Sequence, residues 1–274
     1  MKKLIINLAI VSALGLSGCD SETIKDVKED AVENGTAVVA SARVVFDPAG
    51  SVLSVPNDLL FSGTTDGTLH MPGEKDEEGN ELDSPDYSDP STALGSLDGW
   101  SVAQPFVLDI DFPAGTTLDS NSLSSAESVK IFEALMGGDS GCEEVPRGAA
   151  CTVVGELIFG VDFVTQASGN SIVVVPIKPF KSKTTYILAL TNNIKDSNGK
   201  EVAGSTTYES VRQDITINPL ATDEQKGLQG VINSYENAIV AAGADKDSLI
   251  YTMAMTTQST SDANFAVKSL MVAN

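Results

Sequence analysis

The sequence predicts a mainly β protein: an antiparallel β-sandwich, with an irregular N-terminal segment before it and a helix–strand–helix extension after it. Three observations lead to this fold class. Apolar residues alternate with polar ones in several short runs after Trp100, turn residues separate these runs, and a strong helical pattern appears after Pro219. Short alternating runs with turn signals between them are typical of antiparallel sheets that bury one face.

The chain begins with a short positive segment, Met1-Lys2-Lys3, followed by an apolar stretch from Leu4 to Leu16. This stretch is shorter than the roughly 20 apolar residues that a membrane-spanning helix needs. It fits the apolar part of a secretory signal. We therefore expect residues 1–18 to be a signal peptide.

The residues Leu16-Ser17-Gly18-Cys19 resemble the lipobox of bacterial lipoproteins, in which small residues precede a cysteine that becomes acylated. Cys19 is therefore the expected lipidation site. In the alternative interpretation the signal peptide is an ordinary one and Cys19 is incidental. Two or more acyl chains hold a protein stably on a membrane, so we expect 19–41 to be the lipidated cysteine and a flexible tether.

Residues 42–100 form a turn-rich segment, because proline and glycine recur throughout it. Its most charged stretch, 74–81, is expected to be an exposed loop. Calcium binding is an alternative, but the spacing of the acidic residues fits no loop with an assigned ligand pattern, so no metal is predicted. The acidic residues concerned are Asp76, Glu78, Asp83, Asp86 and Asp89.

The alternation is clearest at 106–112, where four apolar residues share one face and Asp109 and Asp111 point the other way. The turn Ser197-Asn198-Gly199-Lys200 contains Asn-Gly, the strongest short hairpin signal. Further strands are expected at 129–132, 157–163, 172–175, 186–190 and 249–255.

Two further cysteines, Cys142 and Cys151, flank a turn-rich stretch inside the sandwich. In an oxidising compartment such a pair predicts a disulfide, which is worth roughly 2–3 kcal/mol for so small a loop. Two free thiols are the alternative. A metal site is a poorer interpretation, because the only histidine, His70, is distant in the sequence.

The helical pattern begins at a capping box, Thr222-Asp223-Glu224-Gln225, and apolar residues then recur at helical spacing as far as Ile239. Gly243 is expected to end this helix. After the strand at 249–255, a short amphipathic helix is expected over 261–272.

Acidic residues outnumber basic ones by 38 to 17, which gives a net charge of −21. This excess disfavours nucleic acid as a partner, and it disfavours docking through charge onto an anionic bilayer. A solvated extracellular surface is the simplest explanation.

No catalytic set is evident. A serine hydrolase needs a nucleophile, a base and an acid in contact, and no G-x-S-x-G pentapeptide occurs in the chain. Ser140, within Gly138-Asp139-Ser140-Gly141, is similar to a serine-protease nucleophile segment, but these residues are ordinary in turns. Nothing in the sequence places His70 beside it, so we expect a turn and no catalytic residue.

Two other features have a functional and a structural interpretation. Asp109 and Asp111 could form a carboxylate pair, but the wet face of a strand explains them more simply. Trp100 could be an exposed platform for a ligand, but a core aromatic is the favoured interpretation. No cofactor is predicted.

Several segments resemble the opening of the bacterial virulence-factor lipases, a family of surface-exposed or extracellular lipases and lysophospholipases that are often lipoproteins. The resemblance is carried by Phe46-Asp47-Pro48, by the block Val55-Pro56-Asn57-Asp58-Leu59-Leu60-Phe61-Ser62-Gly63, and by Asp66-Gly67-Thr68-Leu69. Later stretches at 104–106, 184–191 and 256–259 add to it. The strand-and-turn pattern is similar to bacterial Ig-like modules, which implies an Ig-like β-sandwich over 101–217.

The resemblance implies that catalysis belongs to an α/β-hydrolase domain after this region, and that 218–274 is a helical linker leading towards it. No position in the chain matches a catalytic residue of the family. The expected function is therefore a non-catalytic accessory region that positions an ester hydrolase at lipid substrate. A stand-alone envelope binding or adhesin-like lipoprotein is the alternative.

The expected partners are the membrane, through the lipid anchor, and a C-terminal or separate hydrolase domain. The resemblance implies the outer membrane or the cell surface. Asp20, directly after the lipidated cysteine, is in the usual sorting rule a signal for retention in the inner membrane. Inner-membrane retention is therefore the alternative location.

Overall fold

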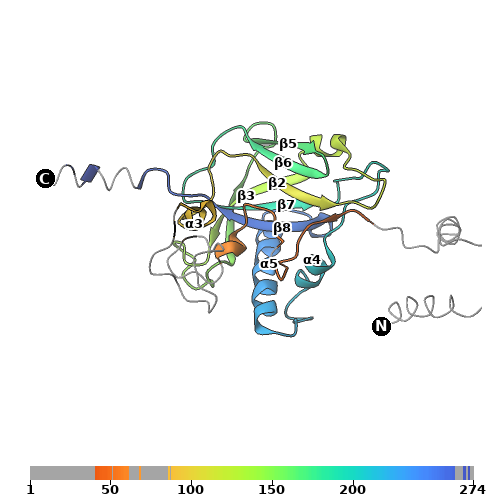
Figure 1. The fold of residues 1–274 in the computed structure, drawn as a ribbon. Helices are drawn as coiled ribbons and strands as arrows, with labels where there is room; N and C mark the ends of the chain where they lie inside the picture. The colour runs from red at the N-terminus through yellow and green to blue at the C-terminus, as the bar shows by residue number, and fades with distance from the viewer. Residues whose placement is uncertain are drawn as a thin grey trace, which may run out of the picture. The chain divides into compact units, whose positions relative to one another are not determined.

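The structure is a computed structural model that describes residues 41–50, 52–61, 68, 86, 88–262, 268–269 and 271. The predictions for residues 1–18, for Cys19 and His70, and for most of 261–272 lie outside these residues. For the part described, the mainly β prediction is confirmed, because two four-stranded sheets make up most of the regular structure (Figure 1).

All neighbouring strands in both sheets pair antiparallel. The first sheet has the order β1 (Arg43–Val44), β2 (Phe106–Asp111), β6 (Ser171–Pro176) and β5 (Phe163–Ser168). The second has the order β4 (Ala150–Glu156), β3 (Val129–Met136), β7 (Thr185–Thr191) and β8 (Leu249–Thr256). The finer expectation of an Ig-like strand arrangement stays a prediction.

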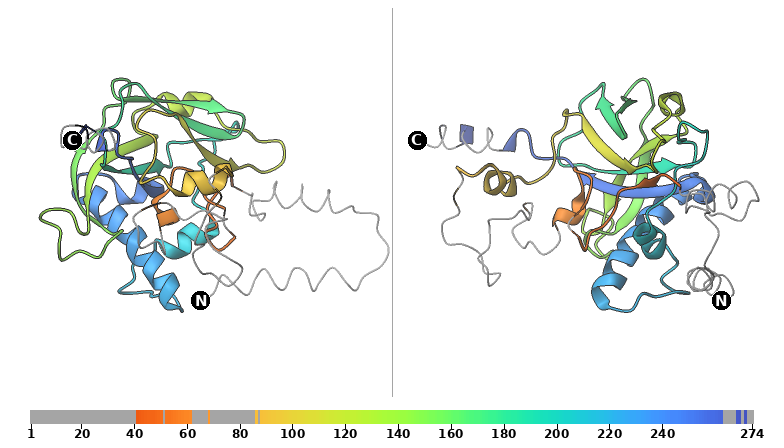
Figure 2. Two further views of the ribbon diagram at one scale, coloured as in Figure 1. Left: turned by 60° about the vertical axis from the view of Figure 1, so that its left-hand side comes forward. Right: turned by 45° about the vertical axis from the view of Figure 1, so that its right-hand side comes forward.

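Helices complete the described part of the fold. The α-helices are α3 (Pro90–Gly95), α4 (Thr206–Val211) and α5 (Asp223–Ala241), and the 3-10 helices are η1 (Asp58–Phe61), η2 (Ser120–Ser124) and η3 (Lys246–Ser248). The views of Figures 1 and 2 agree that α4 and α5 lie on the side of the second sheet away from β5 and β6. The second sheet is therefore the middle layer.

This layering explains the burial pattern of the strands. Along β2, buried and exposed residues alternate, as predicted for a strand with one wet face. Every residue of β7 is buried, and in β8 only the last residue, Thr256, is partly exposed. Strands covered on both faces have near-continuous apolar sequences, which is why 186–190 shows no alternation.

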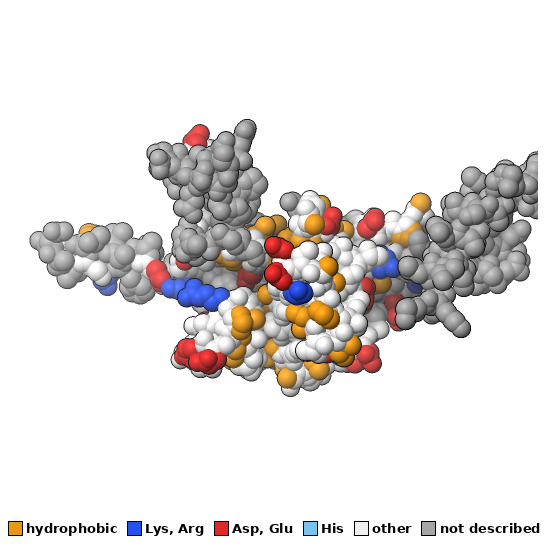
Figure 3. Space-filling model, turned by 90° about the horizontal axis from the view of Figure 1, so that it is seen from below, with side chains coloured by type: hydrophobic (Ala, Val, Ile, Leu, Met, Phe, Trp, Pro, Cys, Tyr) orange, Lys and Arg blue, Asp and Glu red, His pale blue; other side chains and the backbone are white. Residues whose placement is uncertain are grey.

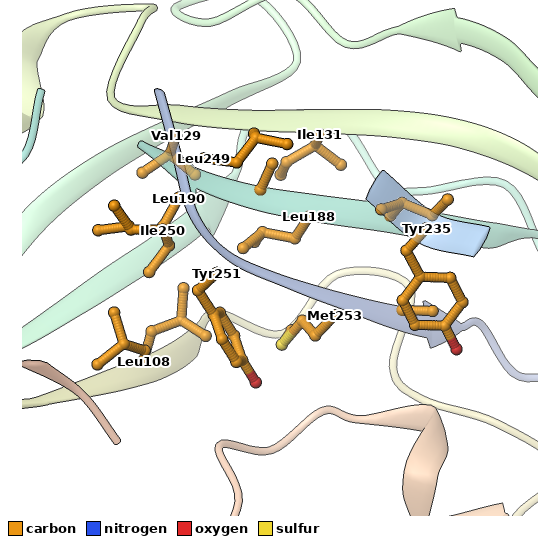
Figure 4. Packing of buried hydrophobic residues seen from close by; sticks show 14 of the residues in the cluster. Leu108, Val129, Ile131, Leu188, Leu190, Tyr235, Leu249, Ile250, Tyr251 and Met253 are labelled. Atoms are coloured by element: carbon orange, nitrogen blue, oxygen red, sulfur yellow. The ribbon is translucent and has the colours of Figure 1, made fainter. Parts of the chain in front are cut away.

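The core joins both sheets and the helices. Leu108 of β2 lies near Tyr251 of β8, and Leu188 of β7 and Tyr235 of α5 belong to the same cluster (Figure 4). Burial of such side chains contributes about 1.5–3 kcal/mol each relative to exposure.

The helix α5 begins as predicted. The Thr222 side chain accepts the N–H of Gln225, and the Gln225 side chain accepts the N–H of Thr222, which completes the capping box. Gly243, just after the helix, has φ +106°, a conformation that favours glycine.

Seen from the side of α4 and α5, apolar side chains lie next to acidic and basic ones, so this face is not uniformly acidic (Figure 3).

The predicted disulfide between Cys142 and Cys151 is present. Helix α5 binds the loop that the disulfide closes. The Tyr235 hydroxyl donates to the carbonyl of Gly148 (3.1 Å), and the N–H of Ala150 donates to the Ser234 hydroxyl (2.8 Å). The predicted Asn-Gly turn is also present, with Gly199 at φ +76°.

The expected strand at 157–163 is wrong. The chain turns there, between the end of β4 and the start of β5 at Phe163. The Asp162 carboxylate accepts the N–H of Ile158 (2.8 Å), and Gly160 has φ +79°. The strand prediction failed because the apolar run lies at a turn, where Ile158 is largely exposed.

A buried polar network connects α4, α5 and β8. The Tyr208 hydroxyl donates to Glu236 (3.0 Å) and bonds Thr252 (2.8 Å), and the Arg212 guanidinium donates to both oxygens of Glu236. Arg212 also donates to the carbonyl of Leu249 (2.7 Å). Burial, and then the charge of Glu236, raise the pKa of Tyr208, so its hydroxyl stays protonated.

Glu236→Ala is expected to lower the free energy of unfolding by about 3 kcal/mol, because it removes the buried partner of Arg212 and leaves only the longer contact with Glu209 (3.7 Å). Tyr208→Phe keeps the ring and is expected to cost only about 1 kcal/mol. Urea unfolding of both variants measures the difference. Equal losses would mean that the ion pair adds nothing beyond an ordinary hydrogen bond.

Candidate functional site

The block Val55 to Phe61 forms a short turn and then η1. The Val55–Pro56 peptide bond is cis. The Asn57 side chain accepts the N–H of Leu59 (3.0 Å), which starts the helical turn in the way that asparagine commonly does. Asp58, the next residue, therefore projects from the first turn of η1.

The Asp58 carboxylate binds two segments that are remote in the sequence. One oxygen accepts the indole N–H of Trp100 (3.1 Å) and the backbone N–H of Thr256 (2.7 Å), and the other accepts the Thr256 hydroxyl (2.6 Å). These contacts span 42 and 198 positions of the chain. A single side chain thus ties η1 to the loop before β2 and to the end of β8.

Burial raises the pKa of Asp58 above its ordinary value of 3.8, and the hydrogen bonds from Thr256 and Trp100 offset this only in part. The hydroxyl of Thr185 bonds the Thr256 hydroxyl (2.7 Å) and extends the network into β7. Loss of the carboxylate would take the acceptor from the Trp100 indole N–H and from the Thr256 N–H, whereas the Thr256 hydroxyl would keep its bond to Thr185.

Trp100 is fixed by its backbone as well as its side chain. Its N–H donates to the carbonyl of Thr256, and its carbonyl accepts the N–H of Gln258, both at 2.8 Å. At Gly99, a Cβ would lie 2.6 Å from the backbone nitrogen of Gln258, so this close approach requires glycine. The Phe61 ring packs edge-on against the indole, with the ring centres 6.4 Å apart.

An apolar cleft of about 550 Å³ lies beside Trp100. None of the described residues that line it is charged. Its lining comes from the block at 55–60, from α3 and the residues after it, from 99–107 and from Gln258. The apolar members are Val55, Pro56, Leu60, Leu94, Leu97, Trp100, Pro105, Phe106 and Val107, and the polar side chains are Ser101, Gln104 and Gln258.

Trp100 is therefore neither a fully buried core residue nor a free platform. It is half-buried, with its N–H in the Asp58 network and its ring in the cleft wall. The favoured interpretation from sequence, a core aromatic, missed this second role. The surrounding apolar residues and the uncommon tryptophan were the only signals available.

Ser101 lies in a segment that is similar to the hydrolase motif. The sequence Gly99-Trp100-Ser101-Val102-Ala103 differs from G-x-S-x-G only at its fifth residue. Its hydroxyl accepts the N–H groups of Ala103 (3.3 Å) and Gln104 (3.1 Å), as in an ordinary serine turn. The segment leads into β2 and not into a helix, so it is no nucleophile elbow. The only histidine, His70, lies outside the described residues.

The other candidate residues have structural explanations. Ser140 lies exposed in a turn two residues before Cys142, outside the loop that the disulfide closes. Asp109 and Asp111 are exposed on β2, as predicted, and Asp109 accepts the Ser171 hydroxyl (2.6 Å).

Over the described residues, no group of three or more His, Cys, Asp or Glu could hold a metal ion. Asp76, Glu78 and Asp83 lie outside these residues. Among the helices that are described, none is long and apolar enough to cross a membrane.

Asp58→Asn is expected to make stability less dependent on pH. The raised pKa means that the folded chain holds the Asp58 proton more tightly than the unfolded chain does. This contribution is complete below 3.8 and is lost as the pH rises through the folded-state pKa. Asparagine keeps an acceptor for both N–H donors and does not titrate.

Denaturant unfolding of both proteins from pH 3 upward, in steps of about one unit, measures this contribution. The parent should lose stability relative to the Asn variant as the pH rises from below 3.8. A difference between the two proteins that stays constant over this range would show that Asp58 titrates normally.

Comparison with known proteins assigns the chain, including the residues of this site, to a family. No curated protein and no solved structure matches the chain. A family model described as bacterial virulence factor lipase N-terminal matches residues 29–274, which include the block with Asp58, Trp100 and the end of β8. The resemblance inferred from that block is therefore confirmed: the chain belongs to the family of bacterial virulence factor lipase N-terminal regions.

Proposed function

We propose that this chain is the non-catalytic N-terminal accessory region of a lipid-anchored bacterial lipase or lysophospholipase, and that it positions the ester hydrolase at lipid substrate. One observation carries the proposal: the family match covers 29–274, while no G-x-S-x-G occurs anywhere in the chain. A lipase family contains a hydrolase, and the residues for that chemistry are not found in this region.

The geometry supports a role without catalysis. A hydrolytic serine needs a base within hydrogen-bond reach. Ser101 accepts two backbone N–H groups in a turn, and Ser140 lies in an exposed loop. Over the part of the chain that the structure describes, neither serine has a hydrogen bond to a side chain that could act as its base.

A lipid anchor on Cys19 would explain how the accessory region helps the hydrolase. Acyl chains on Cys19 would keep the region, and any hydrolase joined to it, at the membrane surface. Tethering raises the local concentration of enzyme at its substrate without any new contact. The family supports an extracellular or surface location. We place the anchor in the outer membrane, with retention in the inner membrane through Asp20 as the alternative.

The apolar cleft at Trp100 also favours a binding role, since concave and mostly apolar sites with a few polar groups are typical ligand sites. It supports the second candidate, a stand-alone envelope binding lipoprotein. The Ig-like arrangement that we propose for the two sheets suits either role, because a fold alone does not fix function.

The isolated chain is expected to hydrolyse neither a short acyl ester nor a lysophospholipid faster than buffer alone. Ser101→Ala and Ser140→Ala should leave this background unchanged. Release of a chromogenic alcohol and of fatty acid measures the two reactions. Hydrolysis that one of these substitutions abolishes would show that the chain contains its own active site.

The lipid anchor has its own test. Cells that express the chain and are fed labelled palmitate should incorporate label into the parent protein and none into Cys19→Ser, because the thiol is the proposed acceptor. Cys142→Ser with Cys151→Ser is the matched control and should keep the label. Equal labelling of the parent and Cys19→Ser would exclude this anchor.

A further inference from the structure

We propose that the apolar cleft beside Trp100 binds the acyl chain of a single-chain lipid whose head is an uncharged glycerol ester, such as a monoacylglycerol. This deepens the proposed function, on which it rests, because it names what the accessory region holds. The cleft would then retain substrate or product of the hydrolase close to the membrane.

The size and lining of the cleft fit one acyl chain. Its volume of about 550 Å³ lies within the range of small-molecule sites. Its walls are aliphatic side chains from three segments, the Phe106 ring and one indole ring. Leu94 and Val55 are about half exposed, at 48% and 52%, so they offer apolar area that a chain would remove from water.

The polar groups of the cleft lie on one side and are uncharged. The N–H of Gln104 donates to the Ser101 hydroxyl, and the N–H of Gln258 donates to the carbonyl of Trp100, so these polar residues are neighbours along this wall. A hydroxyl and two amide side chains can donate to and accept from an ester and glycerol hydroxyls. They provide no charge to pair with a carboxylate.

Among the described residues, a lysine bonded to the cleft lining through its backbone does not change this conclusion. Lys183 approaches Gln258 through its backbone, but its ammonium group is paired with Asp262 at 2.8 Å. An ionised fatty acid would therefore enter the cleft without a cation of its own, which is unfavourable. An uncharged ester head avoids this cost.

The cleft is also preorganised. Asp58 fixes the indole from one side, and the close approach at Gly99 fixes the backbone of the same wall against Gln258. A wall that is already ordered loses little freedom when a ligand binds.

Trp100 is the only tryptophan, so its fluorescence reports on the cleft alone. The chain is titrated with a monoacylglycerol that carries a nitroxide quencher on its acyl chain. We expect saturable quenching that unlabelled monopalmitoylglycerol reverses, and at least tenfold weaker competition by palmitate at neutral pH. Absence of saturable quenching would overturn the site, and palmitate competing equally well would overturn the uncharged head.

A matched pair of substitutions locates the binding. Leu94→Glu puts a charge in the cleft wall and should weaken binding at least tenfold. Ile158→Glu makes the same change at a side chain that is 60% exposed in the turn before β5, and it should bind like the parent. Both positions are exposed enough to keep the fold, which circular dichroism checks. Equal affinities for the two variants would overturn the assignment to this cleft.

Failure of this inference is distinguishable from failure of the proposed function. Loss of the fluorescence response would remove the lipid site and leave the non-catalytic accessory role intact. Serine-dependent ester hydrolysis by the isolated chain would remove the accessory role and leave the binding result as measured.

Discussion

The carboxylate of Asp58 is the contact on which the functional side of this structure depends. It accepts the indole N–H of Trp100 and both donors of Thr256, and so joins the block at 55–61 to the end of β8, the last strand of the second sheet. Burial of this carboxylate is unfavourable, as its raised pKa indicates, and the three hydrogen bonds offset part of that cost. What results is a fixed indole ring in the wall of an apolar cleft.

The rest of the fold gives this contact a rigid base. β7 is buried along its whole length and pairs with β8, which packs against α5 and is buried except at its last residue. The bond between Thr185 and Thr256 therefore connects the Asp58 contact to buried strands. The ion pair of Arg212 and Glu236 fastens α4 to α5. The cleft lies at the end of β8, where loops and not strands provide most of the lining, and loops on a rigid scaffold commonly carry function.

Much of the fold could be predicted from the sequence, because local signals determine it. The alternation of β2, the capping box of α5 and the cysteine pair were each sufficient for a correct prediction. The turn at 157–163 was not, since an apolar run there looks like a strand until Asp162 is seen to bind Ile158. Asp58 was noticed only as part of the family block, because its partners lie 42 and 198 positions away.

The indole N–H resonance of Trp100 tests the central claim most directly, because the chain has a single tryptophan and an isotope-labelled sample gives one signal. We expect an indole N–H that exchanges slowly with water, shifts as Asp58 titrates above 3.8, and moves again when a monoacylglycerol is added. A rapidly exchanging signal that follows neither the titration nor the lipid would contradict both the Asp58 contact and the cleft that it supports.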